Sequence, residues 1–189
     1  MKTQNQKGFT LVEIAIVLVI IGLLLGGVLK GQELIKNAKI KNINNDAQGI
    51  IAAMFSYQDR YGVLPGDDDS STIAAATDGD TTNNNGNGQL EDNESDEFFI
   101  HLREAGLLKG EGGTLPSHAF GGDIELDENA YTNAQGNNLC FVDLPGDVAD
   151  IVDRQNDDGN PSKGSIQSSS TQTAYTTDGS VTYDLCYKL

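Results

Sequence analysis

The sequence predicts an α+β protein in which a long N-terminal helix packs on a small antiparallel sheet with long loops. Three observations predict this fold. An apolar run near the N-terminus is long enough to cross a membrane. Behind it, apolar residues continue at steps of three and four, as they do along one face of a helix. After residue 110 the pattern changes to short segments, and the last of them alternates apolar and polar residues.

The apolar run begins at Phe9 and has no charged or polar side chain between Ile14 and Leu29. The 21 residues from Phe9 to Leu29 would form a helix about 31 Å long, which matches the hydrocarbon core of a bilayer. Glu13 lies inside this block. A carboxylate is costly in lipid, so Glu13 is expected to be functional and to need a partner.

A motif marks the junction between the leader and the apolar run. Residues 1–8 carry two lysines and no acid, so we expect them to stay on the cytoplasmic side. The leader ends in Lys7-Gly8, and Phe9-Thr10-Leu11-Val12-Glu13 follows. This N-terminus resembles that of type IV prepilins, a family that includes the type II secretion pseudopilins.

The resemblance implies a processing and assembly route. In that family a prepilin peptidase cuts after the glycine and methylates the new terminal phenylalanine, and the glutamate then pairs with the terminal amine of a neighbouring subunit. Here the implied sites are Gly8, Phe9 and Glu13. The implied partners are other pilin subunits, the prepilin peptidase and an inner-membrane assembly platform. The implied location is the bacterial inner membrane as a single-pass precursor, and then a periplasmic or extracellular filament.

Two simpler interpretations of the N-terminus remain open. A secretory signal peptide would have a shorter apolar region and a small-x-small cleavage site. A plain membrane anchor would leave Glu13 unexplained.

The helix is predicted to continue beyond the membrane to about Tyr57 as an amphipathic segment. Its apolar stripe consists of Leu34, Ile35, Ala38, Ile43, Ala47, Ile50, Ile51, Met54, Phe55 and Tyr57. We therefore divide the chain into a leader (1–8), a transmembrane and assembly helix (9–31), an amphipathic continuation (32–60) and a globular head (61–189).

The head is predicted to contain short elements between polar loops. A Pro-Gly-Asp turn ends the long helix near residues 61–69. Helices are expected at Ser71–Ala76, at Ser95–Leu108 with Ser95 as its cap, and at Pro145–Gln155. Residues 157–161 have the composition of a tight turn. The candidate strands are Gly122–Leu126, Leu139–Leu144, Gly164–Ser168 and Val181–Lys188.

The charge is unevenly distributed. Residues 1–41 carry six lysines and two glutamates, whereas residues 42–189 carry six basic and 26 acidic residues. A strongly acidic head argues against nucleic acid as a partner, because binding phosphate needs clustered lysine and arginine. It is compatible with a well-solvated exterior and with a divalent cation.

The chain has two cysteines, Cys140 and Cys186, both in the predicted head. In a domain outside the cytosol such a pair indicates one disulfide. The alternative is two buried free thiols.

The segment 83–94 has the spacing of a calcium-binding loop. EF-hand loops place oxygen ligands at positions 1, 3, 5, 7, 9 and 12, with glycine at position 6. Starting from Asn83, Gly88 falls at position 6 and the ligand positions hold Asn83, Asn85, Asn87, Gln89, Glu91 and Glu94. Asparagine at position 1, where aspartate is usual, favours weak binding. The alternative is an Asn/Gly linker that resembles a calcium loop only in composition.

Motifs for catalysis are lacking, and we expect no enzyme. The two histidines lack the spacing of a zinc pair, and there is no nucleophile elbow or phosphate-binding loop. A carboxylate pair for glycoside hydrolysis is not excluded by sequence. The function that we expect is a structural subunit of a type IV pilus or a type II secretion pseudopilus. The alternative is a membrane-anchored binding module that does not polymerise. Glu13 separates the two, since only polymerisation requires it.

Overall fold

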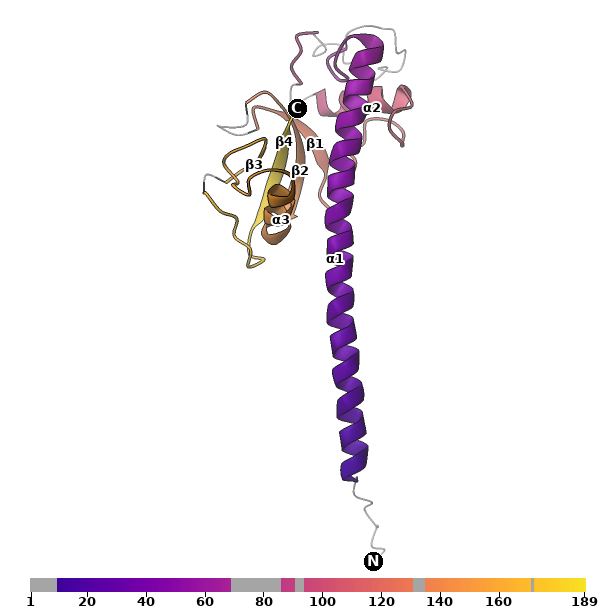
Figure 1. The fold of residues 1–189 in the computed structure, drawn as a ribbon. Helices are drawn as coiled ribbons and strands as arrows, with labels where there is room; N and C mark the ends of the chain where they lie inside the picture. Colours follow the sequence, from indigo (N-terminus) through magenta and orange to yellow (C-terminus); the bar gives the residue numbers. More distant parts are fainter. Residues whose placement is uncertain (1–9, 69–85, 91–93, 131–134, 171) are drawn as a thin grey trace, which may run out of the picture. The chain divides into compact units, whose positions relative to one another are not determined.

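The computed structural model describes residues 10–68, 86–90, 94–130, 135–170 and 172–189. These residues form helices α1 (Leu11–Tyr61), α2 (Ser95–Glu104) and α3 (Gly146–Asn156), and strands β1 (Ile124–Glu128), β2 (Asn137–Pro145), β3 (Ile166–Ser168) and β4 (Thr182–Lys188) (Figure 1). The chain divides into two compact units, Met1–Lys39 and Ile40–Leu189. The predicted α+β class, with a long N-terminal helix and a small antiparallel sheet, is confirmed. The predicted borders at residues 8, 31 and 60 stay predictions.

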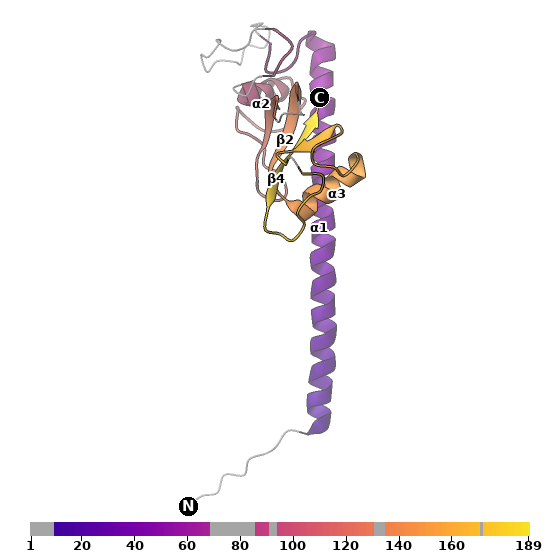
Figure 2. The same ribbon diagram turned by 90° about the vertical axis from the view of Figure 1, so that its left-hand side faces the viewer.

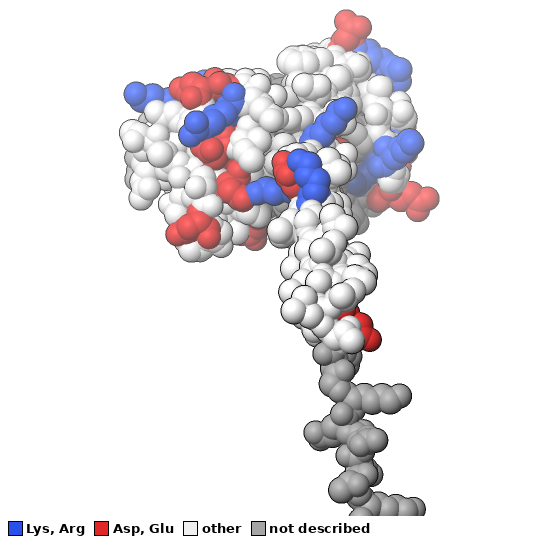
Figure 3. Space-filling view, turned by 60° about the horizontal axis from the view of Figure 1, so that its bottom comes forward, with Lys and Arg blue, Asp and Glu red and all other residues white. Residues whose placement is uncertain are grey.

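The first part of α1 has no apolar partner within the described chain. Every residue from Thr10 to Lys30 is exposed, and Leu11 and Leu23 expose 87% and 73% of their surface. This part is long and apolar enough to cross a membrane. Figure 3 shows it almost without charge, with one acidic side chain near its beginning. Because its apolar residues point in all directions, packing on one neighbouring face would not cover them.

The second part of α1 contributes one stripe to the head core. Its seven buried residues are Ile40, Ile43, Ala47, Ile50, Ala53, Met54 and Tyr57. Leu34, Ile35 and Phe55, which we expected on the stripe, are exposed. Successive helical residues are about 100° apart, so Met54 faces the core and Phe55 does not. Leu34 and Ile35 precede Ile40, the first buried residue of the helix.

The sheet has the strand order β1-β2-β4-β3, and all its neighbours are antiparallel. In its central pair, Leu139 lies opposite Tyr187 and Phe141 opposite Leu185. The register between these strands shifts after Phe141. Asp143, at the shift, has a positive φ of 59°, and its main-chain N–H donates to the Asp184 carboxylate at 2.9 Å. This irregularity is a β-bulge fixed by a side chain of the opposite strand.

The two short helices pack against different parts of the sheet. Residues of α3 contact β2, β3 and β4, while α2 contacts β1 (Figures 1 and 2). Val148 and Val152 of α3 and Phe98 and Phe99 of α2 are fully buried and join the stripe of α1 in one core. Acidic and basic side chains are interspersed over the face of the head in Figure 3.

Helix α2 ends four residues earlier than the predicted Leu108. Gly106 has φ +70°, its N–H donates to the Arg103 carbonyl, and the Leu107 N–H donates to the Leu102 carbonyl. This pair of hydrogen bonds is a Schellman motif, which stops the helix at a glycine. The predicted cap was also wrong. The Ser95 hydroxyl donates to the carbonyl of Leu126 and accepts its N–H, so it joins α2 to β1 instead.

The other predicted elements are confirmed with shifted ends. Strand β1 starts two residues later than predicted, because residues 117–123 form a turn closed by the His118 N–H to the Gly122 carbonyl. Strand β3 also starts two residues late, and α3 is displaced by one residue. The predicted helix Ser71–Ala76 lies outside the described residues.

A disulfide joins Cys140 of β2 to Cys186 of β4, as predicted. The two residues lie directly opposite each other in the ladder, and both are buried. The bond closes a covalent loop that contains α3 and β3.

Replacing both cysteines by alanine should lower the free energy of unfolding by about 4 kcal/mol. The two cysteines are 46 residues apart in the sequence, and the bond between them restricts the unfolded chain. Chemical unfolding of the full chain in detergent micelles, with the oxidised wild type as reference, measures this loss. A non-reducing peptide map is the control. Two free thiols in the exported protein would contradict the bond.

Candidate functional site

The described part of α1 begins with a local hydrogen-bond arrangement around Glu13. The Glu13 carboxylate accepts the Thr10 N–H at 2.8 Å and the Thr10 hydroxyl at 2.7 Å. In return, the Glu13 N–H donates to the Thr10 hydroxyl oxygen at 3.3 Å. This is a capping box, the Thr-x-x-Glu form of a helix N-terminus. Our sequence analysis named Glu13 but missed the box, although Thr10 stands three residues before it.

The capping box provides hydrogen-bond donors for the Glu13 carboxylate in an apolar environment. A side chain three residues away can supply two donors to the carboxylate without any second molecule. These contacts are exposed. A charged donor from outside the chain can therefore reach the carboxylate and replace Thr10 as its hydrogen-bond partner. The predicted cleavage junction, Gly8–Phe9, lies outside the described residues.

Comparison with known proteins decides what this N-terminus is. Residues 3–29 match the family model of the prokaryotic N-terminal methylation motif. This is the prepilin-type cleavage and methylation motif of type IV pilins and pseudopilins. The match includes Gly8, Phe9 and Glu13, and it ends where the apolar run ends. No curated protein and no solved structure matches the chain.

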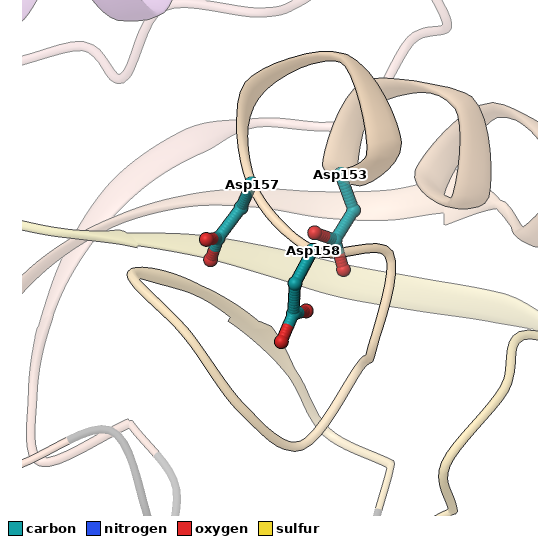
Figure 4. Close-up of side chains that lie close together, drawn as sticks. All are labelled: Asp153, Asp157 and Asp158. Atoms are coloured by element: carbon teal, nitrogen blue, oxygen red, sulfur yellow. The ribbon is translucent and has the colours of Figure 1, made fainter.

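A second group of functional side chains lies at the end of α3. Asp153, Asp157 and Asp158 each bring a carboxylate oxygen within 4.8 Å of the others (Figure 4). Asp153 comes from the last turn of the helix, and the other two belong to the turn that follows. Our sequence analysis predicted the turn but did not predict that the three carboxylates lie together. The signal for it was the spacing of Asp153 and Asp157, four residues or about one helical turn.

These carboxylates accept hydrogen bonds from the loop that follows them. Asp157 accepts the main-chain N–H groups of Ser165 and Ile166, at 2.5 and 2.8 Å. Asp153 accepts the Gly159 N–H at 3.0 Å and the Tyr175 hydroxyl at 2.7 Å. We call the three residues the aspartate clamp. Asp153 and Asp157 hold the loop from α3 to β3 and the Tyr175 segment, whereas the exposed Asp158 accepts the N–H of Asn160 within its own turn at 2.8 Å.

Burial sets the electrostatics of the clamp. Asp153 is fully buried, and this burial raises the pKa of its carboxyl above the usual value, with the nearby Asp157 and Asp158 adding to the increase. The hydrogen bonds from Tyr175 and Gly159 oppose that increase. The pKa of Tyr175 is likewise raised, by burial and by the Asp153 carboxylate. Three acidic oxygens so close together could hold a divalent cation. The hydrogen bonds of Asp153 and Asp157, however, already account for the arrangement as a fastening of the loop.

The predicted calcium loop is only partly described. Asn83, Asn85 and Glu91 lie outside the described residues. Asn87 and Gln89 are exposed, Gly88 has φ +82°, and Glu94 is fully buried at the start of α2. The main-chain N–H groups of Asn87 and Gly88 donate to the Asp67 carboxylate, at 3.0 and 2.6 Å. The calcium site stays a prediction.

Asp153→Ala should lower the free energy of unfolding by about 2 kcal/mol or more, because it leaves the buried Tyr175 hydroxyl without its acceptor. Asp158→Ala is the matched control. Its side chain is exposed, so a change within about 0.5 kcal/mol is expected. Chemical unfolding of the full chain compares the two. Equal midpoints for both variants would contradict the clamp.

If the loop 83–94 binds calcium, millimolar calcium should raise the melting temperature of the full chain in detergent. Asn87→Ala, which removes an exposed ligand, should reduce the shift. Asp158→Ala should leave it unchanged and thereby separates the loop from the aspartate clamp. A shift lost only in Asp158→Ala would place the ion at the clamp, and no shift in the wild type would favour the linker interpretation.

Proposed function

We propose that the chain is a structural subunit of a type IV pilus or a type II secretion pseudopilus, which polymerises through α1 after a prepilin peptidase has removed the leader. The observation that carries this proposal is the methylation motif at residues 3–29, followed by an apolar helix that is exposed on all sides. A membrane-anchored precursor fits both features. A filament offers the same helix a second apolar environment among copies of itself.

The glycines of the helix support close packing between subunits. A Cβ added at Gly22, Gly26, Gly27 or Gly31 would meet no described atom within 4 Å apart from the backbone of its own helix turn, so no contact within the described residues requires a glycine there. Each glycine costs about 1 kcal/mol of helix stability relative to alanine. Close approach of another helix would explain these glycines, because small residues let the backbones of two helices in a membrane come close together.

The capping box supports a two-stage role for Glu13. Before assembly, Thr10 supplies the donors that keep the carboxylate satisfied within one molecule. During assembly, the methylated amine of Phe9 from a neighbouring subunit would replace them with a charge pair. An unpaired carboxylate at this depth costs about 3 kcal/mol, so a wrongly staggered subunit would be penalised.

The alternative, a membrane-anchored binding module that does not polymerise, also agrees with an apolar helix and a solvated acidic head. Glu13 distinguishes the two proposals, because an anchor needs it at most as the partner of Thr10 in the capping box, whereas polymerisation requires its negative charge. The choice between pilus and secretion pseudopilus depends on the filament in which the chain is found.

The first experiment concerns processing. Intact-mass analysis of the mature protein should find a chain that starts at Phe9 and carries one additional methyl group. Gly8→Val should prevent cleavage, because a side chain next to the scissile bond obstructs the approach of a protease to the backbone. A mature chain that still begins at Met1, or begins beyond Lys30, would refute this route.

The second experiment concerns assembly. Glu13→Leu should insert into the membrane normally and form no filaments, as isolated filament yield and membrane fractionation would show. Glu13→Gln is the matched control for charge, since it keeps an acceptor for Thr10 but cannot pair with an amine as an ion. It should also fail to assemble. Wild-type filament yield from either variant would refute charge pairing by Glu13.

A further inference from the structure

Both histidines of the chain are buried, and His101 lies where α1, α2 and the turn after α1 meet. Its ring stacks on Tyr57 of α1, with the centroids 5.8 Å apart and the planes 13° from parallel. Its Nδ1 accepts the main-chain N–H of Gly66 at 2.9 Å. A ring nitrogen that accepts a hydrogen bond carries no proton, so this contact requires a neutral imidazole protonated on Nε2.

Gly66 approaches α2 so closely that only glycine fits. Its φ is +93°, and an added Cβ would lie 3.3 Å from both the Glu94 carbonyl oxygen and the Phe98 Cβ. The Gly66 N–H is therefore enclosed by α2, and the His101 ring provides its acceptor. Loss of that acceptor would leave a buried donor unsatisfied, which costs more than the hydrogen bond itself contributes.

Two carboxylates fasten the same turn by other contacts. Asp68 accepts the Tyr57 hydroxyl at 2.9 Å, and Asp67 accepts the N–H groups of Asn87 and Gly88. Of the side chains in these three fastenings, imidazole is the type whose ordinary pKa lies close to neutral pH.

Several ionisable groups belong to the elements that pack around the ring. They are Tyr57, Arg60 and Tyr61 from α1, Asp67 and Asp68 from the turn, and Glu94 and Glu97 at the beginning of α2. Burial lowers the pKa of His101 below its usual value, and the Asp68 carboxylate opposes this effect. The neutral ring is thus the form that the folded surroundings favour.

We propose that His101 is an acid-sensitive fastening of the 62–68 turn to α2. A proton on Nδ1 removes the acceptor of the Gly66 N–H, and the turn separates from α2 while the disulfide-linked sheet stays folded. This device belongs to the head and does not depend on polymerisation.

The sign of the pH effect follows from proton binding. The released turn exposes the ring, whose pKa returns towards 6.5. In the fastened state the pKa of His101 is lower than 6.5. At pH values between this lowered pKa and 6.5, the fastened state therefore binds fewer protons than the released state. Within this window each unit of falling pH should increase the released population by up to about tenfold, and below the window the effect should level off.

Amide hydrogen exchange of the full chain in detergent micelles tests the proposal between about pH 7.5 and 5. After correction for the intrinsic exchange rate, protection of the Gly66 amide should fall by up to about tenfold per pH unit. Protection of the Phe141 and Leu185 amides in the central strand pair should not change. The ¹⁵N resonance of His101 Nδ1 in the dominant, fastened state should remain that of an unprotonated nitrogen until the pH falls to the lowered pKa of that state.

Two variants separate the imidazole from the carboxylates around it. Asparagine at position 101 can place its side-chain oxygen near the site of Nδ1 and accept without titrating, so His101→Asn should make the Gly66 amide independent of pH. Asp68→Asn removes an anion that favours the charged ring, so it should move the transition to lower pH.

Protection of the Gly66 amide that does not change with pH in the wild type would overturn the proposal. A pH response in His101→Asn equal to that of the wild type would also overturn it, because the effect would then belong to the carboxylates. If His101→Asn does not fold, the wild type decides. A His101 Nδ1 that becomes protonated while the Gly66 amide keeps its full protection would equally overturn it.

Discussion

One unbroken helix meets two different surroundings, and the rest of the chain follows from that constraint. From Leu11 to Leu29 the apolar side chains of α1 point in all directions and are exposed, whereas from Ile40 to Tyr57 only one stripe is apolar and buried. Apolar surface that surrounds a helix cannot remain in water at a tolerable free energy. Lipid or other apolar helices must cover the first part. The second part needs only one folded head, which the remaining residues supply.

The head compensates for a small sheet by anchoring its loops through buried side chains. Tyr57 donates to Asp68 and Tyr175 donates to Asp153, and in each pair the aspartate lies close to where a helix gives way to a turn. Burial and the neighbouring carboxylate raise the pKa of both tyrosines, so these hydroxyls remain donors throughout the physiological range. Such pairs fix a polar loop to the core without adding a strand. The disulfide adds a covalent link between β2 and β4.

Features governed by local pattern could be predicted from the sequence, and features that arise from distant contacts could not. The long helix, the four strands and the cysteine pair follow from periodicity and composition, and the methylation motif was recognisable in the seven residues from Lys7 to Glu13. Gly106 could have indicated the end of α2. The apolar residues with helical spacing continue to Leu108, however, so the sequence pattern predicted a longer helix. The role of Ser95 was not accessible, because its partner Leu126 is 31 residues away. The aspartate clamp likewise needed the return of the chain to Ser165 and Tyr175 before its purpose was visible.

The position of the disulfide has a consequence for how the head withstands proteolysis. Cys140 and Cys186 enclose α3, the aspartate clamp and β3 within one covalent ring. A protease that cuts a single peptide bond between them converts the ring into two arms that remain tethered. Strand β4 would still be held beside β2 after such a nick, so the damaged molecule keeps its central ladder and its attachment to α1. A single cut between Cys140 and Cys186 thus releases no part of the head.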